Sequence, residues 1–247
     1  MAGFFKTRKE MMRESRGGKI SLNIAAWPEL PEGIDPFYQD SNVILFNCDC
    51  LSNIGLWNID NAVMVSDPPY GMKFQSHMRK DGPSDAIAGD ESPELRDKIL
   101  EAWGDIKPAL VFGTWRVPRP TACKQLLIWN KTGVGPLMGN LDLPWGPCHE
   151  DVYVLGSGFV GKRVSNVLTF DGLTPGSKDR PNHPTPKPVS LMKDLISHCP
   201  PSLIVVDPFA GSGTTLVAAK ALGRKAIGIE LETKYCEVIV ERLLKEA

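Results

Sequence analysis

The stretch LIVVDPFAGSGTTLVAAKALGRKAIGIE, residues 203–230, decides the fold. Residues 203–206 form a short apolar run rich in β-branched side chains, which predicts a buried strand. The glycines in residues 210–213 predict a tight turn, and residues 214–222 predict the helix that follows it. A second strand is expected over residues 225–230. This strand–turn–helix–strand pattern is typical of a βαβ unit in a parallel sheet.

The turn limits the kind of ligand that this unit can bind. Neither Lys-Ser nor Lys-Thr follows its glycines, so it is not a P-loop, and Leu216 stands where a dinucleotide fingerprint has its third glycine. The second strand ends on Glu230, whose carboxylate could hold ribose hydroxyls. These features suit a nucleoside without phosphates, such as S-adenosylmethionine. An ordinary tight strand-to-helix turn is the alternative interpretation.

A second motif, Asp67-Pro68-Pro69-Tyr70, ends the apolar run over residues 62–66. The exocyclic amine of adenine or cytosine is a poor nucleophile, because its lone pair is delocalised into the ring. The Asp67 carboxylate and the Pro68 carbonyl can each accept one amine hydrogen, and Tyr70 offers a face on which the base can stack. The same residues also make a good strand terminator, because proline fixes φ and lacks an N–H. The motif alone leaves both interpretations open.

Together these segments resemble the β class of DNA amino-methyltransferases, in which the catalytic motif precedes the cofactor motif. The resemblance covers about residues 42–245 and rests on four motifs. These are DPPY at 67–70, HPTPKP at 183–188, DPFAGSGTT at 207–215 and AIGIELETKYCEVIVERL at 226–243, with weaker matches at 47–49, 128–131 and 149–150. The resemblance implies an α/β fold with a doubly wound, seven-stranded, mostly parallel sheet. This is the Rossmann-like methyltransferase fold with a circularly permuted motif order.

The resemblance also implies roles for individual residues. Asp67, Pro68, Pro69 and Tyr70 would be catalytic. Glu230 would bind the ribose of S-adenosylmethionine, Asp49 would reach its adenine, and Lys187 would lie near its methionine carboxylate. Phe209, Gly211 and Gly213 would shape the pocket around the donor. The remaining expected cofactor-binding residues lie in the same motifs: His183, Thr185, Asp207, Ser212, Thr214 and Thr215.

The implied reaction is methylation of the adenine N6 amine in a specific DNA sequence, with the target base flipped out of the helix. The family tends to place Asp first in the tetrapeptide for adenine and Ser for cytosine N4, so Asp67 favours adenine. Cytosine N4 is the close alternative. A nucleotide-dependent oxidoreductase would leave DPPY unexplained, and a non-catalytic nucleic-acid-binding module would leave both motifs unexplained.

Composition predicts one domain. The chain has 247 residues, of which 42% are apolar and 23% charged, as is ordinary for a globular protein. We expect a basic arm over residues 1–41, for which a solvated tail is the alternative, and a methyltransferase domain over 42–247. This domain would comprise a catalytic half (42–155), a target-recognition segment (156–182) and a cofactor half (183–247). The six cysteines show no paired metal spacing, so no metal site is expected.

The net charge does not by itself predict a protein that binds DNA. The 28 basic and 29 acidic residues give a net charge of −1, so DNA binding would need a local basic cleft. We expect the irregular segments 71–91 and 156–182 to cover the flipped base and to touch the groove. The candidate DNA contacts are Lys73, Arg79, Lys80, Lys162, Arg163, Lys178 and Arg180. The resemblance leaves a homodimer and a cognate restriction endonuclease open as further partners.

With no signal peptide and no long apolar span, we expect no membrane contact and a place in the cytoplasm of a bacterial, archaeal or phage-infected cell. Seven strands are expected, over 43–47, 62–66, 109–113, 125–129, 151–155, 203–206 and 225–229, with helices alternating between several of them.

Overall fold

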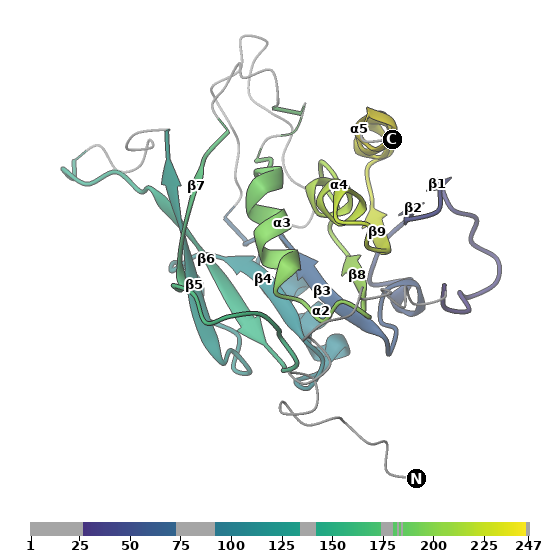
Figure 1. Ribbon diagram of the computed structural model, residues 1–247, viewed down its shortest axis with the longest axis horizontal. Helices are drawn as coiled ribbons and strands as arrows, with labels where there is room; N and C mark the ends of the chain where they lie inside the picture. Colours follow the sequence, from purple (N-terminus) through teal and green to yellow (C-terminus); the bar gives the residue numbers. More distant parts are fainter. Residues whose placement is uncertain are drawn as a thin grey trace, which may run out of the picture.

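The computed structural model describes residues 27–72, 92–133, 142–173, 180–181, 183 and 185–245. Within this part of the chain a single nine-stranded sheet has the order β1-β2-β9-β8-β3-β4-β6-β5-β7 (Figure 1). The strands are β1 Tyr38–Gln39, β2 Val43–Asn47, β3 Ala62–Ser66, β4 Ala109–Gly113, β5 Gln125–Thr132, β6 His149–Leu155, β7 Val167–Asp171, β8 Ile204–Asp207 and β9 Ala226–Glu230. The helices are η1 Ile54–Leu56, α2 Glu94–Trp103, α3 Val189–Ser197, α4 Thr214–Ala221 and α5 Thr233–Lys245.

The seven predicted strands are all present, and the sheet has two more. β2, β9, β8, β3 and β4 are successive parallel neighbours, which confirms a mostly parallel sheet. The first additional strand, β1, is only two residues long. The second, β7, lies inside the segment 156–182, which we expected to be irregular. Its five residues alternate between exposed and half-buried positions, so its apolar side chains do not form the continuous run that marked the buried strands.

Helices cover both faces of the sheet, as expected for a doubly wound fold (Figure 1). Side chains alternate between the two faces along each strand. Val63 and Val65 of β3 belong to the apolar cluster that contains residues of α3, α4 and α5. Met64, between them, belongs to the cluster with Ile99 and Trp103 of α2.

The two halves of the predicted domain are interleaved in this sheet. Strands β9 and β8 of the cofactor half lie between β2 and β3 of the catalytic half. Separating the halves would therefore expose one edge of β2 and one edge of β3, and the apolar faces that they bury.

We expect that neither residues 1–155 nor residues 183–247 fold alone, because each fragment would lack the strands that complete its part of the sheet. Circular dichroism during thermal unfolding of the two separate fragments checks this. A C-terminal fragment that unfolds cooperatively and binds S-adenosylmethionine would show instead that the halves are independent domains.

No helix in the described part of the chain is long and apolar enough to cross a membrane.

Candidate active site

One edge of the sheet gathers most of the residues singled out in the sequence. The parallel strands β2, β9, β8, β3 and β4 all end there, because their carboxyl ends point the same way. The segments that follow β2, β8 and β3 carry Asp49, the glycine turn and the DPPY tetrapeptide, and β9 ends on Glu230. An open α/β sheet binds its ligands outside this edge.

Glu230 and the glycine turn are held together by direct hydrogen bonds. The backbone N–H of Gly211 donates to Glu230 Oε2 at 2.8 Å, and the N–H of Glu232 donates to Oε1 at 2.8 Å. The side chain is almost buried, and this burial raises the pKa of Glu230 to about 7. A carboxylate held at the bottom of the turn, with further lone pairs on both oxygens, is suited to accept hydroxyl hydrogens.

The turn requires glycine at both of its predicted positions. Gly211 and Gly213 have φ of +52° and +74°, in the left-handed region that favours glycine. A Cβ atom on Gly213 would lie 2.7 Å from Ile239 of α5, and one on Gly211 would lie 3.1 Å from His183 Nε2. The absence of side chains therefore lets α5 and the HPTPKP segment approach the turn closely.

The HPTPKP segment packs beside this turn. The His183 ring meets the Tyr235 ring edge-on, with 4.8 Å between centroids. His183 Nδ1 accepts a hydrogen bond from the Thr185 N–H at 3.3 Å. The structure thus places His183 beside the glycine turn and Thr185 next to His183, and contact of either residue with the donor stays a prediction.

The side chains of Asp207, Ser212 and Thr214, which also belong to the cofactor motif, make hydrogen bonds to other groups of the protein. Asp207 Oδ1 accepts hydrogen bonds from Ser66 Oγ at 2.6 Å and from the Phe209 N–H at 3.1 Å, which ties β8 to β3. Burial raises the pKa of Asp207 to about 6. The hydroxyls of Ser212 and Thr214 lie 3.1 Å apart. Thr215 is buried in the first turn of α4.

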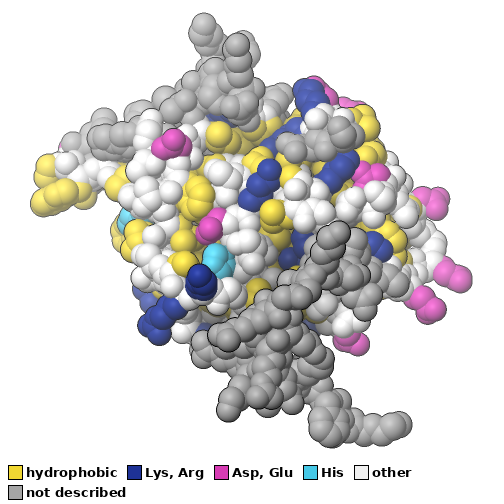
Figure 2. All heavy atoms as spheres, in the orientation of Figure 1, with side chains coloured by type: hydrophobic (Ala, Val, Ile, Leu, Met, Phe, Trp, Pro, Cys, Tyr) yellow, Lys and Arg dark blue, Asp and Glu magenta, His cyan; other side chains and the backbone are white. Residues whose placement is uncertain are grey.

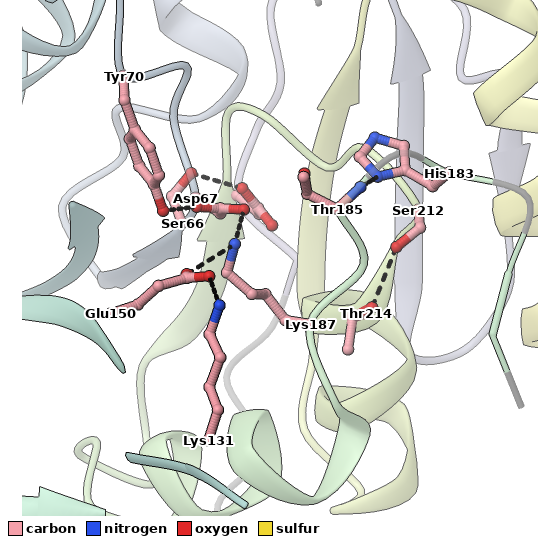
Figure 3. Close-up of polar contacts among 11 residues, drawn as sticks. Ser66, Asp67, Tyr70, Lys131, Glu150, His183, Thr185, Lys187, Ser212 and Thr214 are labelled. Atoms are coloured by element: carbon pink, nitrogen blue, oxygen red, sulfur yellow. Dashed lines mark hydrogen bonds and ion pairs between the residues drawn. The ribbon is translucent and has the colours of Figure 1, made fainter. Parts of the chain in front are cut away.

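A line of charged side chains runs away from Asp67 (Figure 3). Tyr70 Oη donates to Asp67 Oδ1 at 2.5 Å, and Lys187 Nζ donates to Oδ2. The same ammonium lies 3.2 Å from Glu150 Oε2, and Glu150 Oε1 accepts a hydrogen bond from Lys131 Nζ at 2.5 Å. The charges alternate in sign along this line.

Burial and charge compete at each of these groups. Burial raises the pKa of Asp67, Lys187 opposes this rise and Glu150 adds to it. Burial alone would lower the pKa of Lys187, but the Asp67 and Glu150 carboxylates together raise it. Burial also opposes ionisation of Glu150, yet Lys187 and Lys131 hold the pKa of Glu150 below its usual value. The pairing therefore keeps Lys187 and Glu150 charged.

Lys187 pairs with two carboxylates of the protein. The resemblance placed this lysine near the methionine carboxylate of the donor, whereas here its ammonium pairs with the catalytic carboxylate and with Glu150. Contact with the donor stays a prediction. Asp49 is exposed in the loop after β2, where its carboxylate accepts a hydrogen bond from the Ser52 N–H at 2.9 Å.

Glu150 and Lys131 are the site residues that the sequence reasoning did not assign. Trp129 of β5 and Val152 of β6 face the cluster with α3. Lys131 and Glu150 stand two residues from them along the same strands, on the same face and nearer to the active-site edge. The alternation of side chains along these two strands, together with the weaker family matches at 128–131 and 149–150, was the signal in the sequence that could have identified Lys131 and Glu150.

The predicted DNA contacts are only partly tested by the geometry. Lys73, Arg79, Lys80 and Lys178 lie outside the described residues. Arg180 uses one guanidinium nitrogen to bond the Leu173 carbonyl at 2.8 Å.

Lys162 and Arg163 are exposed and lie at the opposite edge of the sheet from the active site, which argues against the DNA contacts that we predicted for them. β6 is antiparallel to β4, with Leu155 opposite Ala109, and the loop after it therefore starts where the parallel strands begin. Its Val160 N–H donates to the carbonyl of His198, just after α3, at 2.8 Å.

For this reason we expect the double variant Lys162→Ala/Arg163→Ala to leave the affinity for DNA and its salt dependence unchanged. A titration of labelled duplex at several salt concentrations checks this. Loss of the two phosphate contacts would instead reduce the salt slope by about two.

Comparisons with known proteins agree with this arrangement. The family model described as "DNA methylase", N6_N4_Mtase, matches residues 142–241. A putative methylase of Escherichia coli K12, YubD, is 35% identical over 203 residues, which cover 74% of this chain and 82% of YubD. The type II methyltransferase M.HinfI of Haemophilus influenzae is 53% identical over an alignment covering 79% of this chain and 66% of that protein. The DNA adenine methyltransferase YhdJ of E. coli K12 is 51% identical over 83 residues, 33% of this chain and 28% of YhdJ.

Solved structures show the same fold. The M1.HpyAVI–SAM complex has a TM-score of 0.55 and 25% identity, and the match covers 81% of this chain and all of that one. The PvuII cytosine-N4-specific DNA methyltransferase has a TM-score of 0.63 at 16% identity, covering 85% of this chain and 89% of that one. The chain therefore belongs to the N6/N4 DNA methylase family of S-adenosylmethionine-dependent DNA methyltransferases, which have a Rossmann-like fold.

Proposed function

We propose that this protein transfers a methyl group from S-adenosylmethionine to the N6 amine of adenine in DNA. The observation that carries the proposal is the Asp67 carboxylate, which Tyr70 and Lys187 hold at the same sheet edge as the glycine turn and Glu230. Asp at the first position of the tetrapeptide favours adenine through the family resemblance, and YhdJ, which carries the name of an adenine methyltransferase, supports the same choice.

Cytosine N4 remains the second candidate, because the PvuII enzyme shares this fold. The two targets present the same chemistry to Asp67, an exocyclic amine on an aromatic ring. The shape of the base pocket must therefore decide between them, and the segment after Tyr70 that would border it lies outside the described residues.

The residues of the glycine turn fit the nucleoside part of the methyl donor. Glu230 would accept hydrogen bonds from the ribose hydroxyls, and Gly211 and Gly213 would let the ligand approach the backbone. Asp49, in the loop beside the end of β9, would reach the adenine. The turn lacks the lysine that a P-loop places after its glycines. When bound, the donor supplies an electrophilic methyl group on a positively charged sulfur.

Asp67 would act on the target amine and not on the donor. Each carboxylate oxygen has two acceptor positions, so Asp67 can accept one amine hydrogen while Tyr70 and Lys187 keep their contacts, and the Pro68 carbonyl would accept the other. As methylation proceeds, positive charge grows on the nitrogen, and its attraction to Asp67 strengthens. An interaction that is stronger in the transition state than in the ground state lowers the barrier.

The target base must leave the DNA helix to reach this carboxylate, which costs a few kcal/mol. Stacking on the Tyr70 ring would return about 1–3 kcal/mol. A recognition sequence, a homodimer and a cognate restriction endonuclease are further expectations that rest on the resemblance alone, and the expected cytoplasmic location rests on the sequence.

The purified protein tests the proposal directly. Unmethylated bacterial DNA is incubated with protein and S-adenosylmethionine and digested to nucleosides, which are then identified by mass spectrometry. We expect N6-methyladenine. N4-methylcytosine in its place would select the second candidate, and the absence of both products would contradict the function.

A further inference from the structure

The four charged groups that start at Asp67 form a line with no net charge when all are ionised (Figure 3). The side chains of Lys187, Lys131 and Glu150 are only 7%, 13% and 20% exposed. Charges with so little access to water are stable only while their partners remain, and removing one partner leaves an uncompensated charge. Each member of the line therefore affects the others.

Glu150 and Asp67 share the Lys187 ammonium as an ion-pair partner, and the Glu150 charge also repels that of Asp67 directly. Its Oε1 accepts a hydrogen bond from Lys131, whereas its Oε2 has no hydrogen-bond partner among the described residues and faces the Lys187 ammonium as an ion pair at 3.2 Å. Lys187 is thus attracted in two directions, towards Asp67 and towards Glu150. Without Glu150, the whole attraction of this ammonium would fall on Asp67.

We propose that Glu150 is a positioning residue for methyl transfer. Glu150 and Asp67 both attract the Lys187 ammonium, so that Lys187 orients the catalytic carboxylate without neutralising it. Lys131 balances the charge of Glu150 from the other side. The inference rests on the proposed function of Asp67 as the acceptor for the target amine, and it holds for adenine and for cytosine.

Shared attraction has a consequence that can be measured. Removing the negative charge of Glu150 leaves Asp67 with a closer cation, which makes the Asp67 carboxylate harder to protonate and a weaker acceptor for the amine. Removing the positive charge of Lys131 strengthens the hold of Glu150 on Lys187, which makes Asp67 easier to protonate. The other titratable groups around the line are present in both variants: Tyr70 after β3, Tyr153 and Asp151 on β6, and Asp207 at the end of β8. The Glu150 charge raises the pKa of Tyr70 and of Asp151, so Glu150→Gln also makes these two groups easier to ionise.

The experiment measures single-turnover methylation across pH 5–9, with saturating S-adenosylmethionine and DNA that the wild-type protein methylates. We expect Glu150→Gln to react about 10- to 100-fold more slowly, because a misplaced reacting group has effects of this size. The acid limb of its pH profile should move to lower pH. Lys131→Gln should move the acid limb to higher pH. The double variant should return the limb close to the wild-type position.

An NMR titration and a control variant distinguish a positioning role of Glu150 from damage to the fold. In donor-free protein, carboxyl ¹³C NMR titration of Asp67 should show the same opposite displacements in the two single variants. Lys220→Gln is the matched control, because the Lys220–Asp40 pair, 2.9 Å apart, has side chains 13% and 22% exposed and lies towards the other end of the sheet. This variant should leave the pH profile and the titration unchanged.

Displacements in the same direction in both variants, or none in either, would overturn the proposal. A wild-type protein that methylates no DNA amine would contradict the proposed function instead. In that case the NMR titration of the donor-free protein still decides whether Glu150 and Lys131 act on Asp67.

Discussion

Replacing Asp67 by Asn should slow methyl transfer by about 10²–10³-fold or more, the loss typical of removing one preorganised electrostatic group from a transition state. The amide nearly matches the carboxylate in shape, but it carries no charge to attract the amine nitrogen as that nitrogen becomes positive. The NH2 group of the amide would also lie near the Lys187 ammonium, which donates to Oδ2 in the native protein. Single-turnover methylation of DNA measures the change.

Binding of S-adenosylmethionine should remain largely intact in this variant, because Asp67 acts on the amine and Glu230 with the glycine turn would hold the donor. Calorimetric titration with the donor checks this separation. Asp105→Asn is a suitable control, since this carboxylate is exposed in the loop after α2. An Asp67→Asn protein with near wild-type turnover would remove DPPY from the mechanism.

The sequence predicted the central fold well because its strands are buried on both faces. Runs such as 62–66 and 203–206 are continuously apolar, and the structure has β3 and β8 there with every residue buried. β7 was missed because it is an edge strand whose residues are exposed at alternate positions. Its residues Val167–Asp171 include types that favour strands, but they stand in a segment with several glycines and prolines, which we interpreted as irregular. Pairing with β5 defines the strand.

The orientation of β6 could not be read from the sequence. We expected the segment 156–182 to touch the groove, but a loop after a strand lies at the active-site edge only where that strand is parallel to the others. β6 runs antiparallel to both of its neighbours. The segment that begins at Gly156 therefore starts at the far edge, and β7 returns the chain to the near edge. Strand direction depends on pairing across the sheet, which local patterns do not encode.

The sequence also did not predict which side chains form ion pairs and hydrogen bonds with the catalytic carboxylate. Lys187 is 120 residues from Asp67 along the chain, and Glu150 reaches the site on a different strand. The motifs covered all four members, since DPPY, HPTPKP and the weaker matches at 128–131 and 149–150 were noted, but no motif showed that these side chains pair. The ion pairs that join them follow from the strand order β3-β4-β6-β5, which brings Lys131 and Glu150 to the same face and edge.

Replacing Glu230 by Ala should weaken S-adenosylmethionine binding by about 2–3 kcal/mol, because the ribose hydroxyls would lose hydrogen bonds to a charged acceptor. This corresponds to an increase in Kd of about 30- to 150-fold. Calorimetric titration measures the change. Glu232→Gln is a matched control, because its side chain is 44% exposed and only its backbone N–H contacts Glu230. Equal affinities in wild-type and Glu230→Ala proteins would show that the ribose contact is misplaced.

The buried position of Glu230 adds a pH dependence to this prediction. Its pKa of about 7 in the donor-free protein means that the carboxylate is mostly protonated at pH 6 and mostly ionised at pH 8. The ionised form is the better acceptor for two hydroxyl hydrogens, so the fraction able to bind the donor rises with pH. Since the apparent Kd is the intrinsic Kd divided by that fraction, the donor should bind about tenfold more tightly at pH 8 than at pH 6. Glu230→Gln, which cannot ionise, should bind more weakly at pH 8 and lose most of the difference between the two pH values. If the Kd of the wild-type protein for the donor were the same at pH 6 and at pH 8, the ribose would be held by another group.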